Sequence, residues 1–185
     1  MQIFNYEINE ILESCTSILP PAHLAVAVDI LAILDKEGYV SSIYNKFPQS
    51  RATGTTSTHS ILAKISLRDH SIHVARKFQA MVDHRQLLYP LGIIACLAHD
   101  IGKIPRICNQ LPGEYTMTKH ARAGAVAMER LIDGRLTTRE ALAVILAIRH
   151  HHDCNTNASP ILDLLRRADC EARDDELIGL FRGEA

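Results

Sequence analysis

Prolines and glycines divide the chain into segments in which apolar residues recur every three or four positions. The main breaks fall at Pro20–Pro21, Gly38, Pro90, Gly102 and Pro105. Proline interrupts a helix because it lacks an amide hydrogen, and glycine readily adopts the left-handed conformation that ends one. A half-buried strand would alternate every two residues, and only short pieces such as 39–44 are ambiguous in this respect. The pattern predicts an all-α helical bundle.

The periodic segments give the expected helices. They cover residues 3–19, 23–37, 61–84, 90–99, 118–132, 138–151 and 160–173. Thr137 or Thr138, followed by Glu140, is a typical N-terminal signal because these side chains can satisfy the first free amides of a helix. Residues 39–60 are rich in serine and threonine and contain Pro48 and Gly54, which predicts a long loop. Loops of this length in compact domains are often functional lids.

Composition narrows the class of partner. The chain of 185 residues has 20 Lys and Arg against 21 Asp and Glu, a formal net charge of −1, so no overall positive field attracts nucleic acid or an anionic membrane. The longest apolar runs, 91–98 and 141–148, are far shorter than the roughly 20 residues that span a bilayer. The N-terminus has no basic lead or cleavable apolar stretch. We expect a cytoplasmic globular protein, with homo-oligomerisation left open.

Histidine is unusually frequent. The chain has ten, and five of them lie between His99 and His152. The side chains that could bind a metal fall on or just after the expected helices, and in chain order they are His70, His99, Asp100, His120, His150, His151, His152 and Asp169. Neutral imidazole and carboxylate are suitable ligands for iron, manganese, nickel or zinc. The sequence therefore predicts a site for divalent transition metal ions.

The sequence around these residues resembles the HD-domain superfamily of metal-dependent hydrolases. The string His-Asp-Ile-Gly-Lys from His99 to Lys103 is similar to the family's signature and is much more specific than a His-Asp pair alone. Residues 68–75 are similar to the family's first-histidine helix, and residues 165–169 to its closing aspartate helix. The resemblance runs from about 67 to 173, more than half of the chain. It implies an all-helical enzyme built around a metal site.

The resemblance implies a role for each candidate ligand. His70, His99, Asp100 and Asp169 would hold one ion. The His-x-x-x-Gly string that begins at His120 is similar to the branch of the family with two metals, which includes the HD-GYP cyclic-dinucleotide phosphodiesterases. We therefore expect two ions, drawn from iron, manganese, nickel and zinc, with His120 as a ligand of the second.

The histidine triplet is similar to the Ile-Arg-x-His-His-Glu string of the same branch. This similarity implies that His151 is a metal ligand, that His152 faces the substrate or another ion, and that His150 is a spacer, although the register can shift by one residue. The chain continues through 154–160 without the Gly-Tyr-Pro segment of HD-GYP enzymes. Cyclic di-GMP is therefore not implied as the substrate.

Chemical roles follow from the implied ligand set. Asp100 is the natural bridge, because one carboxylate can give an oxygen to each of two ions, and a hydroxide shared by the ions would be the nucleophile. Lys103 and Arg106 provide cations that could hold phosphate oxygens. The expected catalytic residues are Asp100 and Lys103, and the expected substrate-binding residues are Lys103, Arg106 and His152.

The implied activity is metal-dependent hydrolysis of a phosphomonoester or phosphodiester, in a nucleotide or related small molecule. The expected organisation is a helical pair in 1–38 packed on the core, a loop or lid in 39–60, the HD metal-binding core in 61–175 and a tail in 176–185, with the charges of 173–176 forming a solvated terminus. Two alternatives stay open. One is a di-iron oxygenase of HD type, and the other is a nucleotide-binding regulatory module without turnover.

Overall fold

The computed structural model describes residues 5–43, 58–153 and 159–182, and within these ranges every regular element is a helix. The α-helices are α1 (Tyr6–Thr16), α2 (Pro21–Glu37), α3 (Thr58–Leu62), α4 (Leu67–Met81), α5 (Tyr89–Ala98), α6 (Pro105–Cys108), α7 (Met117–Ile132), α8 (Thr138–His150) and α9 (Pro160–Arg182). A 3₁₀ turn, η1, covers Ile101–Lys103. In the ambiguous stretch 39–44, the described backbone makes an isolated bridge from Ser41 to Ser66. The all-α prediction is confirmed.

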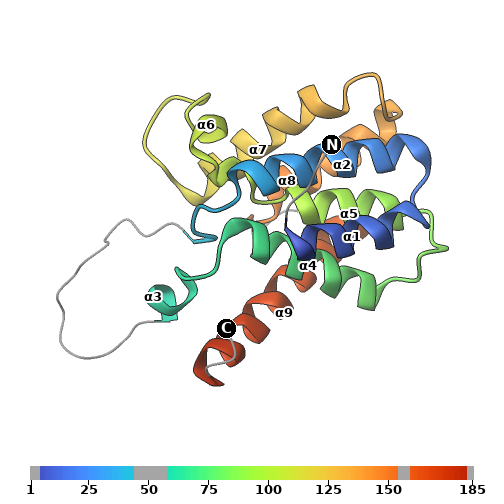
Figure 1. Ribbon diagram of the computed structural model, residues 1–185. Coiled ribbons are helices and arrows are strands. Elements are labelled where there is room, and N and C mark those ends of the chain that lie inside the picture. Colours follow the sequence, from blue (N-terminus) through green and yellow to red (C-terminus); the bar gives the residue numbers. More distant parts are fainter. Residues whose placement is uncertain (1–4, 44–57, 154–158, 183–185) are drawn as a thin grey trace, which may run out of the picture.

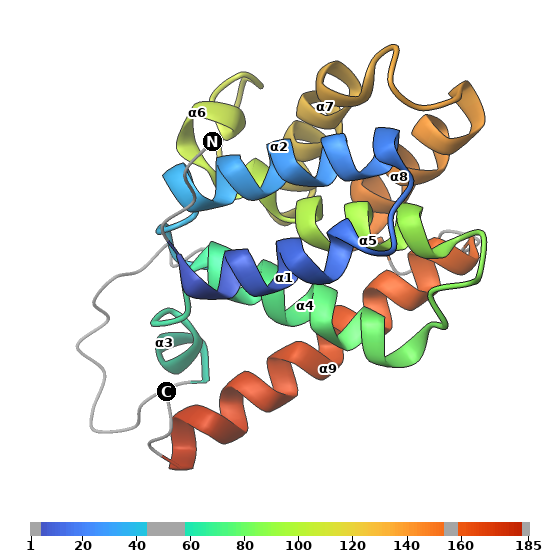
Figure 2. The same ribbon diagram turned by 45° about the vertical axis from the view of Figure 1, so that its right-hand side comes forward.

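Helix α5 lies at the centre of the bundle (Figures 1 and 2). It packs against α2, α4, α8 and α9, and all of its residues except Pro90 and Leu91 are buried. Such a helix is apolar on every side, because it has no face in contact with solvent. Its C-terminal end therefore delivers the next two residues, His99 and Asp100, to the interior, where they are 0% and 2% exposed.

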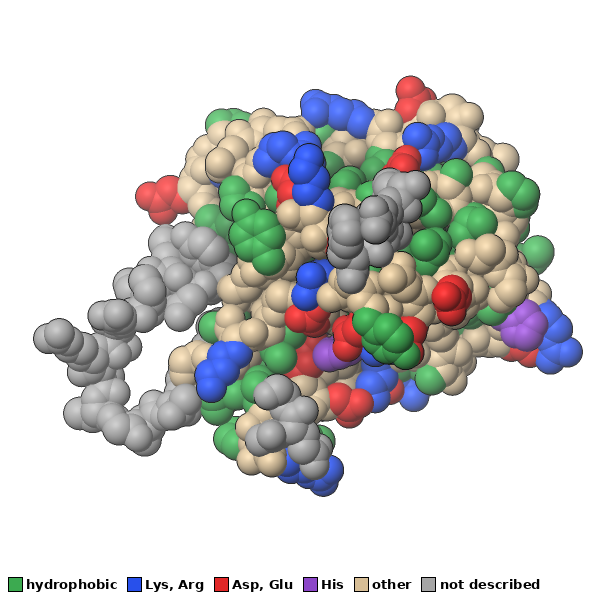
Figure 3. Space-filling view, viewed as in Figure 1, with side chains coloured by type: hydrophobic (Ala, Val, Ile, Leu, Met, Phe, Trp, Pro, Cys, Tyr) green, Lys and Arg blue, Asp and Glu red, His purple; other side chains and the backbone are tan. Residues whose placement is uncertain are grey.

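The first two helices pack side by side, with α1 against α4 and α2 against α5. Helix α1 ends at Thr16, before the proline pair, and Pro21 occupies the first turn of α2. A proline fits there because the amide hydrogen it lacks would have no partner in the helix. Most of the expected loop or lid at 39–60 lies outside the described residues. None of the described helices is both long and apolar enough to cross a membrane. Acidic and basic side chains are spread over the face of the molecule seen in Figure 3.

The last helix is longer than the sequence pattern predicted. The pattern predicts an end at Arg173, followed by a solvated terminus, but α9 continues to Arg182. The solvated-terminus interpretation is wrong for Arg173 and Glu176, whose side chains are 18% and 1% exposed. The reason is helical register: positions four and seven residues after Asp169 lie on the same face of α9 as Asp169, and that face points into the bundle.

Candidate metal centre

The candidate ligands come from five helices that converge in the bundle. His70 lies in the first turn of α4 and His120 in the first turn of α7. His99 and Asp100 follow α5, His151 and His152 follow α8, and Asp169 lies within α9. Side chains of Ser66, Thr116 and Thr137 accept the amide hydrogens of the first turns of α4, α7 and α8, which fixes where these helices begin.

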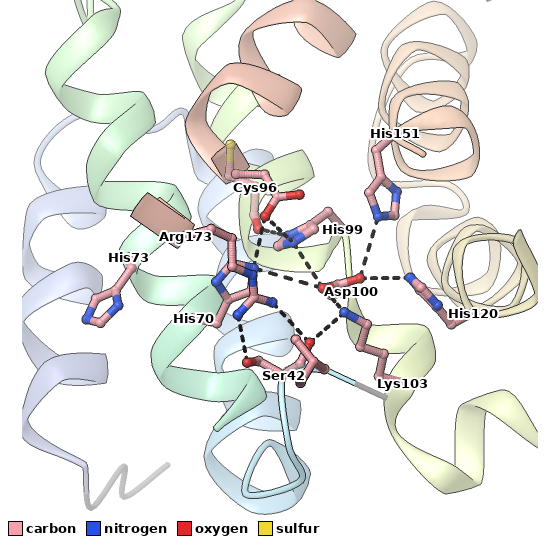
Figure 4. A network of polar contacts seen from close by, with 12 residues as sticks. Ser42, His70, His73, Cys96, His99, Asp100, Lys103, His120, His151 and Arg173 are labelled. Atoms are coloured by element: carbon pink, nitrogen blue, oxygen red, sulfur yellow. Dashed lines mark hydrogen bonds and ion pairs between the residues drawn. The ribbon is translucent and has the colours of Figure 1, made fainter. Parts of the chain in front are cut away.

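Asp100 lies between two groups of histidines (Figure 4). Its Oδ2 atom is 3.3 Å from Nε2 of His99 and 4.0 Å from Nε2 of His70. Its Oδ1 atom is 3.0 Å from Nε2 of His120 and 3.5 Å from Nε2 of His151. Two ligand atoms that each lie about 2 Å from a shared ion are about 3 to 4 Å apart. The spacing suits one carboxylate oxygen directed toward each of two ions.

Asp169 and His152 extend the two groups. Oδ1 of Asp169 lies 3.1 Å from Nε2 of His70 and 3.9 Å from Nε2 of His99. Nε2 of His152 lies 2.9 Å from Nε2 of His120. The possible ligands form two sets, and within each set the ligand atoms lie within 4.8 Å of one another. One set is His70, His99 and Asp100, and the other is Asp100, His120, His151 and His152. Asp100 belongs to both.

Two of the histidines are oriented by the ends of their own helices. Nδ1 of His99 donates to the carbonyl oxygen of Cys96 at 2.8 Å, and Nδ1 of His151 donates to that of Ile148 at 2.6 Å. These carbonyls belong to the last turns of α5 and α8, where backbone oxygens have no partner within the helix. A proton held on Nδ1 leaves the lone pair of Nε2 for a metal ion.

The other two histidines, His70 and His120, lie in the first turns of their helices, where the backbone carbonyls accept hydrogen bonds within the helix. The partners of their Nδ1 atoms are therefore side chains. Nδ1 of His120 is 2.8 Å from the hydroxyl oxygen of Tyr115. Nδ1 of His70 donates to the carboxylate of Glu176 at 2.9 Å. Each of the four buried imidazoles around Asp100 therefore presents Nε2 toward its carboxylate and has Nδ1 fixed by an outer partner, as metal-binding histidines do.

Several buried atoms at the centre have no hydrogen-bond partner among the described residues. They are Nε2 of His70, His99 and His151 and Oδ1 of Asp100. An unpaired buried polar atom costs about 1 to 3 kcal/mol, and these four belong to the two groups around one carboxylate. Lone pairs that face one another across 3 to 4 Å repel unless a cation lies between them. The residues present therefore fit divalent metal ions.

The protonation states also suit metal ions. Burial raises the pKa of Asp100, but the charge of Lys103 and the imidazoles around the carboxylate outweigh burial and hold the pKa well below its usual range. Burial is likewise outweighed at Asp169, chiefly by the neighbouring imidazole of His70, and its pKa is lowered. Burial lowers the pKa of His120, and that of His152 to about 3. At neutral pH the carboxylates are ionised and these two imidazoles are neutral, as metal ligands must be.

Glycines bring the backbone segments of the two groups close together. A side chain at Gly102 would place its Cβ 1.9 Å from the carbonyl oxygen of His120, and the Cβ of one at Gly124 would lie 3.3 Å from the amide nitrogen of Gly102. Turn η1 therefore packs directly on α7. This contact sets the short distance between Asp100 and His120.

The structure brings most of the expected site residues together. His151 and His152 face Asp100 and His120, whereas Nδ1 of His150 pairs with Asp153 at 2.7 Å, away from the site. Of the three possible registers of the triplet, the geometry favours the one in which His150 is the spacer.

Arg106 is not at the centre. Its guanidinium makes two hydrogen bonds to the Glu37 carboxylate, at 2.7 and 3.0 Å, and its side chain is 59% exposed. The expectation that Arg106 binds substrate is therefore not supported. The physical reason is that Arg106 lies on the short helix α6, whose outer face lies beside the end of α2 rather than beside Asp100.

The sequence patterns missed three residues at the centre, which are Ser42, Arg173 and Glu176. Arg173 donates to the hydroxyl and carbonyl oxygens of Ser42, at 2.8 and 3.0 Å, and to Glu176 at 2.9 Å. Lys103 donates to Asp100 at 2.5 Å and to the same Ser42 carbonyl at 2.6 Å. The spacing of Asp169, Arg173 and Glu176 along α9 could have identified two of them. Ser42 carries no local signal.

A cleft of about 530 Å³ opens beside Asp100. Its lining combines the charged or titratable side chains of Lys103, His152 and Arg173 with the apolar side chains of Leu62 and Met117. A neighbouring cavity of about 530 Å³ shares Lys103 with the cleft. These volumes are within the range of small-molecule sites, which combine an apolar lining with a few polar groups.

Comparison with known proteins identifies the family. The family model of the HD domain matches residues 67–178. This range is more than half of the chain and holds both groups of possible ligands. No curated protein and no solved structure matches the chain. The match does not single out the HD-GYP branch, and the closeness to that branch stays a prediction. HD domains bind divalent metal ions and indicate hydrolase-type chemistry. The chain belongs to the HD-domain family.

Proposed function

We propose that this protein is a binuclear metal-dependent phosphohydrolase that cleaves a phosphomonoester or phosphodiester in a nucleotide or related small molecule. The observation that carries the proposal is the position of Asp100, whose two oxygens face two separate groups of histidines at 3.0 to 4.0 Å. One ion would be held by His70, His99, Asp169 and Asp100. The other would be held by His120, His151 and Asp100, with His152 beside them.

Cations beside the ligand groups support phosphate as the group bound. The Nζ atom of Lys103 has three donors, of which two are directed to Asp100 and Ser42. Arg173 lines the same cleft and is oriented by Ser42 and Glu176. A lysine acts on phosphate as a point charge and an arginine as a planar fork. These two side chains would bind phosphoryl oxygens and hold the ester beside Asp100.

Bound divalent ions would supply Lewis acidity, lowering the pKa of water and neutralising charge on the phosphoryl oxygens. The chain's own contribution is orientation and charge. Asp100 stays ionised, Lys103 and Arg173 position the phosphoryl group, and the buried histidines keep their protons on the outer nitrogen. The apolar side chains Leu62 and Met117 would contact the remainder of the substrate.

The proposal predicts that hydrolysis depends on metal. Metal-free protein, loaded separately with manganese, iron, nickel or zinc, is assayed against p-nitrophenyl phosphate, bis-p-nitrophenyl phosphate and a panel of nucleotides. Phosphoester cleavage is expected with at least one metal and not without it. His151→Ala is expected to lower the rate by about 10²-fold or more, because a ligand of one ion is lost.

The matched control is His150→Ala, which removes the neighbouring histidine that faces Asp153. Its rate should stay close to that of the wild type. Equal losses in the two variants would contradict the assigned register. Oxygen consumption by iron-loaded protein without phosphate release would favour the oxygenase alternative, and tight nucleotide binding by inactive, metal-replete protein would favour a regulatory module.

A further inference from the structure

Glu176 is a buried carboxylate on the outer side of His70, away from Asp100. Glu176 as a whole is 5% exposed. Oε1 accepts hydrogen bonds from Nδ1 of His70 at 2.9 Å and from Nδ1 of His73 at 3.1 Å, and Oε2 accepts one from Arg173 at 2.9 Å. A buried charge is retained only where donors compensate it. Glu176 is therefore fixed from three sides and cannot turn away from His70.

The inner nitrogen of His70 faces carboxylates. Nε2 lies 3.1 Å from Oδ1 of Asp169 and 4.0 Å from Oδ2 of Asp100, and it has no hydrogen-bond partner among the described residues. If Nδ1 carries the proton that Glu176 accepts, Nε2 presents a lone pair to these oxygens. Such an arrangement is attractive only with a cation between the nitrogen and the oxygens.

His70 needs this partner more than His99 or His151 does. Those two histidines follow helices and donate to free carbonyls of the last turn, at Cys96 and Ile148. His70 lies in the first turn of α4, where the carbonyls are engaged by the helix itself. Its outer nitrogen can be satisfied only by another element, and α9 provides Glu176.

We infer that Glu176 is the positioning residue of the metal centre: it holds the proton of His70 on Nδ1 and directs Nε2 toward the ion shared with His99 and Asp169. The inference rests on the proposed binuclear centre and extends it to a residue two helical turns beyond Asp169. His73 and Arg173 hold the carboxylate, so their contribution to His70 is indirect.

The test is a titration of metal-free protein with Mn²⁺, followed through the electron paramagnetic resonance signal of free Mn²⁺. Glu176→Gln is nearly isosteric but neutral, and one class of Mn²⁺ site is expected to weaken by about 10- to 100-fold, the usual effect of removing an outer partner of a ligand. The other class should be unchanged. Glu176→Asp, which keeps the charge, should recover part of the affinity.

The control variant is Asp175→Asn, which removes the adjacent carboxylate. Asp175 pairs with Lys77 and its side chain is 63% exposed, so both classes of site should keep their wild-type affinity. Unchanged Mn²⁺ binding in Glu176→Gln, or equal weakening of both classes, would overturn the inference alone. Absence of Mn²⁺ uptake by the wild type would overturn the metal centre itself, and the inference with it.

A second measurement does not depend on the variant folding. In zinc-loaded wild-type protein, long-range ¹H–¹⁵N correlation spectra distinguish a protonated ring nitrogen from a metal-bound one. His70 is expected to carry its proton on Nδ1 and zinc on Nε2. Zinc on Nδ1, with the proton on Nε2, would overturn the inference.

Discussion

Replacing Asp100 with asparagine is expected to remove at least one of the two metal ions and to abolish hydrolysis. Each oxygen of Asp100 faces a different group of histidines, and an asparagine can offer an oxygen to one group only, while its amide turns hydrogens toward the other. Loss of a bridging ligand removes several kcal/mol of transition-state stabilisation. A loss of about 10³-fold or more in rate corresponds to about 4 kcal/mol. Metal content should fall to about one ion per chain or less.

The appropriate control is Asp163→Asn. Asp163 lies in the first turn of α9, on the same helix as Asp169, and is exposed. This variant should bind metal and turn over substrate as the wild type does. An Asp100→Asn protein that keeps two ions and a rate within tenfold of the wild type would contradict the role of Asp100 as the shared ligand.

Gly102→Ala is expected to produce the largest loss of stability of the variants considered. The added Cβ would lie 1.9 Å from the carbonyl oxygen of His120 and 2.7 Å from the amide nitrogen of Gly124. Overpacking costs typically 1 to 3 kcal/mol, and here the obstructing atoms are backbone atoms of α7, which cannot rotate aside. We expect the free energy of unfolding to fall by about 3 kcal/mol or more, measured by urea denaturation of metal-free protein.

Gly179→Ala provides the matched control for this substitution. Gly179 lies within α9, and apart from the adjoining helix backbone no atom of the described residues comes within 4 Å of a Cβ built there. Alanine is the better helix former by about 1 kcal/mol, so this variant should be as stable as the wild type or slightly more stable. If Gly102→Ala unfolded at the same urea concentration as the wild type, η1 would not pack on α7 as described.

The helices and most of the centre could be predicted because their signals are local. A helical period, an N-capping threonine or a proline can be read from a few neighbouring residues, and the all-α fold is confirmed. The strings around His99 and His120 also lie within single segments, and the structure brings these histidines together around Asp100. Helix ends were less predictable: α9 continues nine residues beyond the expected Arg173, because no proline follows Arg173 within the helix and Gly179 is accommodated in it.

Contacts between distant segments could not be predicted in the same way. Ser42 meets Arg173 across 131 positions of sequence, and Arg106 pairs with Glu37 across 69. Nothing in the sequence near Arg106 indicates that its partner lies at the end of α2 rather than at a phosphate. The role of Glu176 could be predicted only in part. Its position on the same face of α9 as Asp169 follows from the helical period, but its contact with His70 depends on how α9 packs on α4.

The central claim is that the chain holds two metal ions around Asp100, and metal content tests it most directly. Protein produced without a His-tag and purified without chelator would be analysed by plasma mass spectrometry, as isolated and after incubation with manganese, iron, nickel or zinc. We predict about two ions per chain, of types known to bind nitrogen and oxygen ligands. No bound metal as isolated, and no uptake from any of the four ions, would contradict the account.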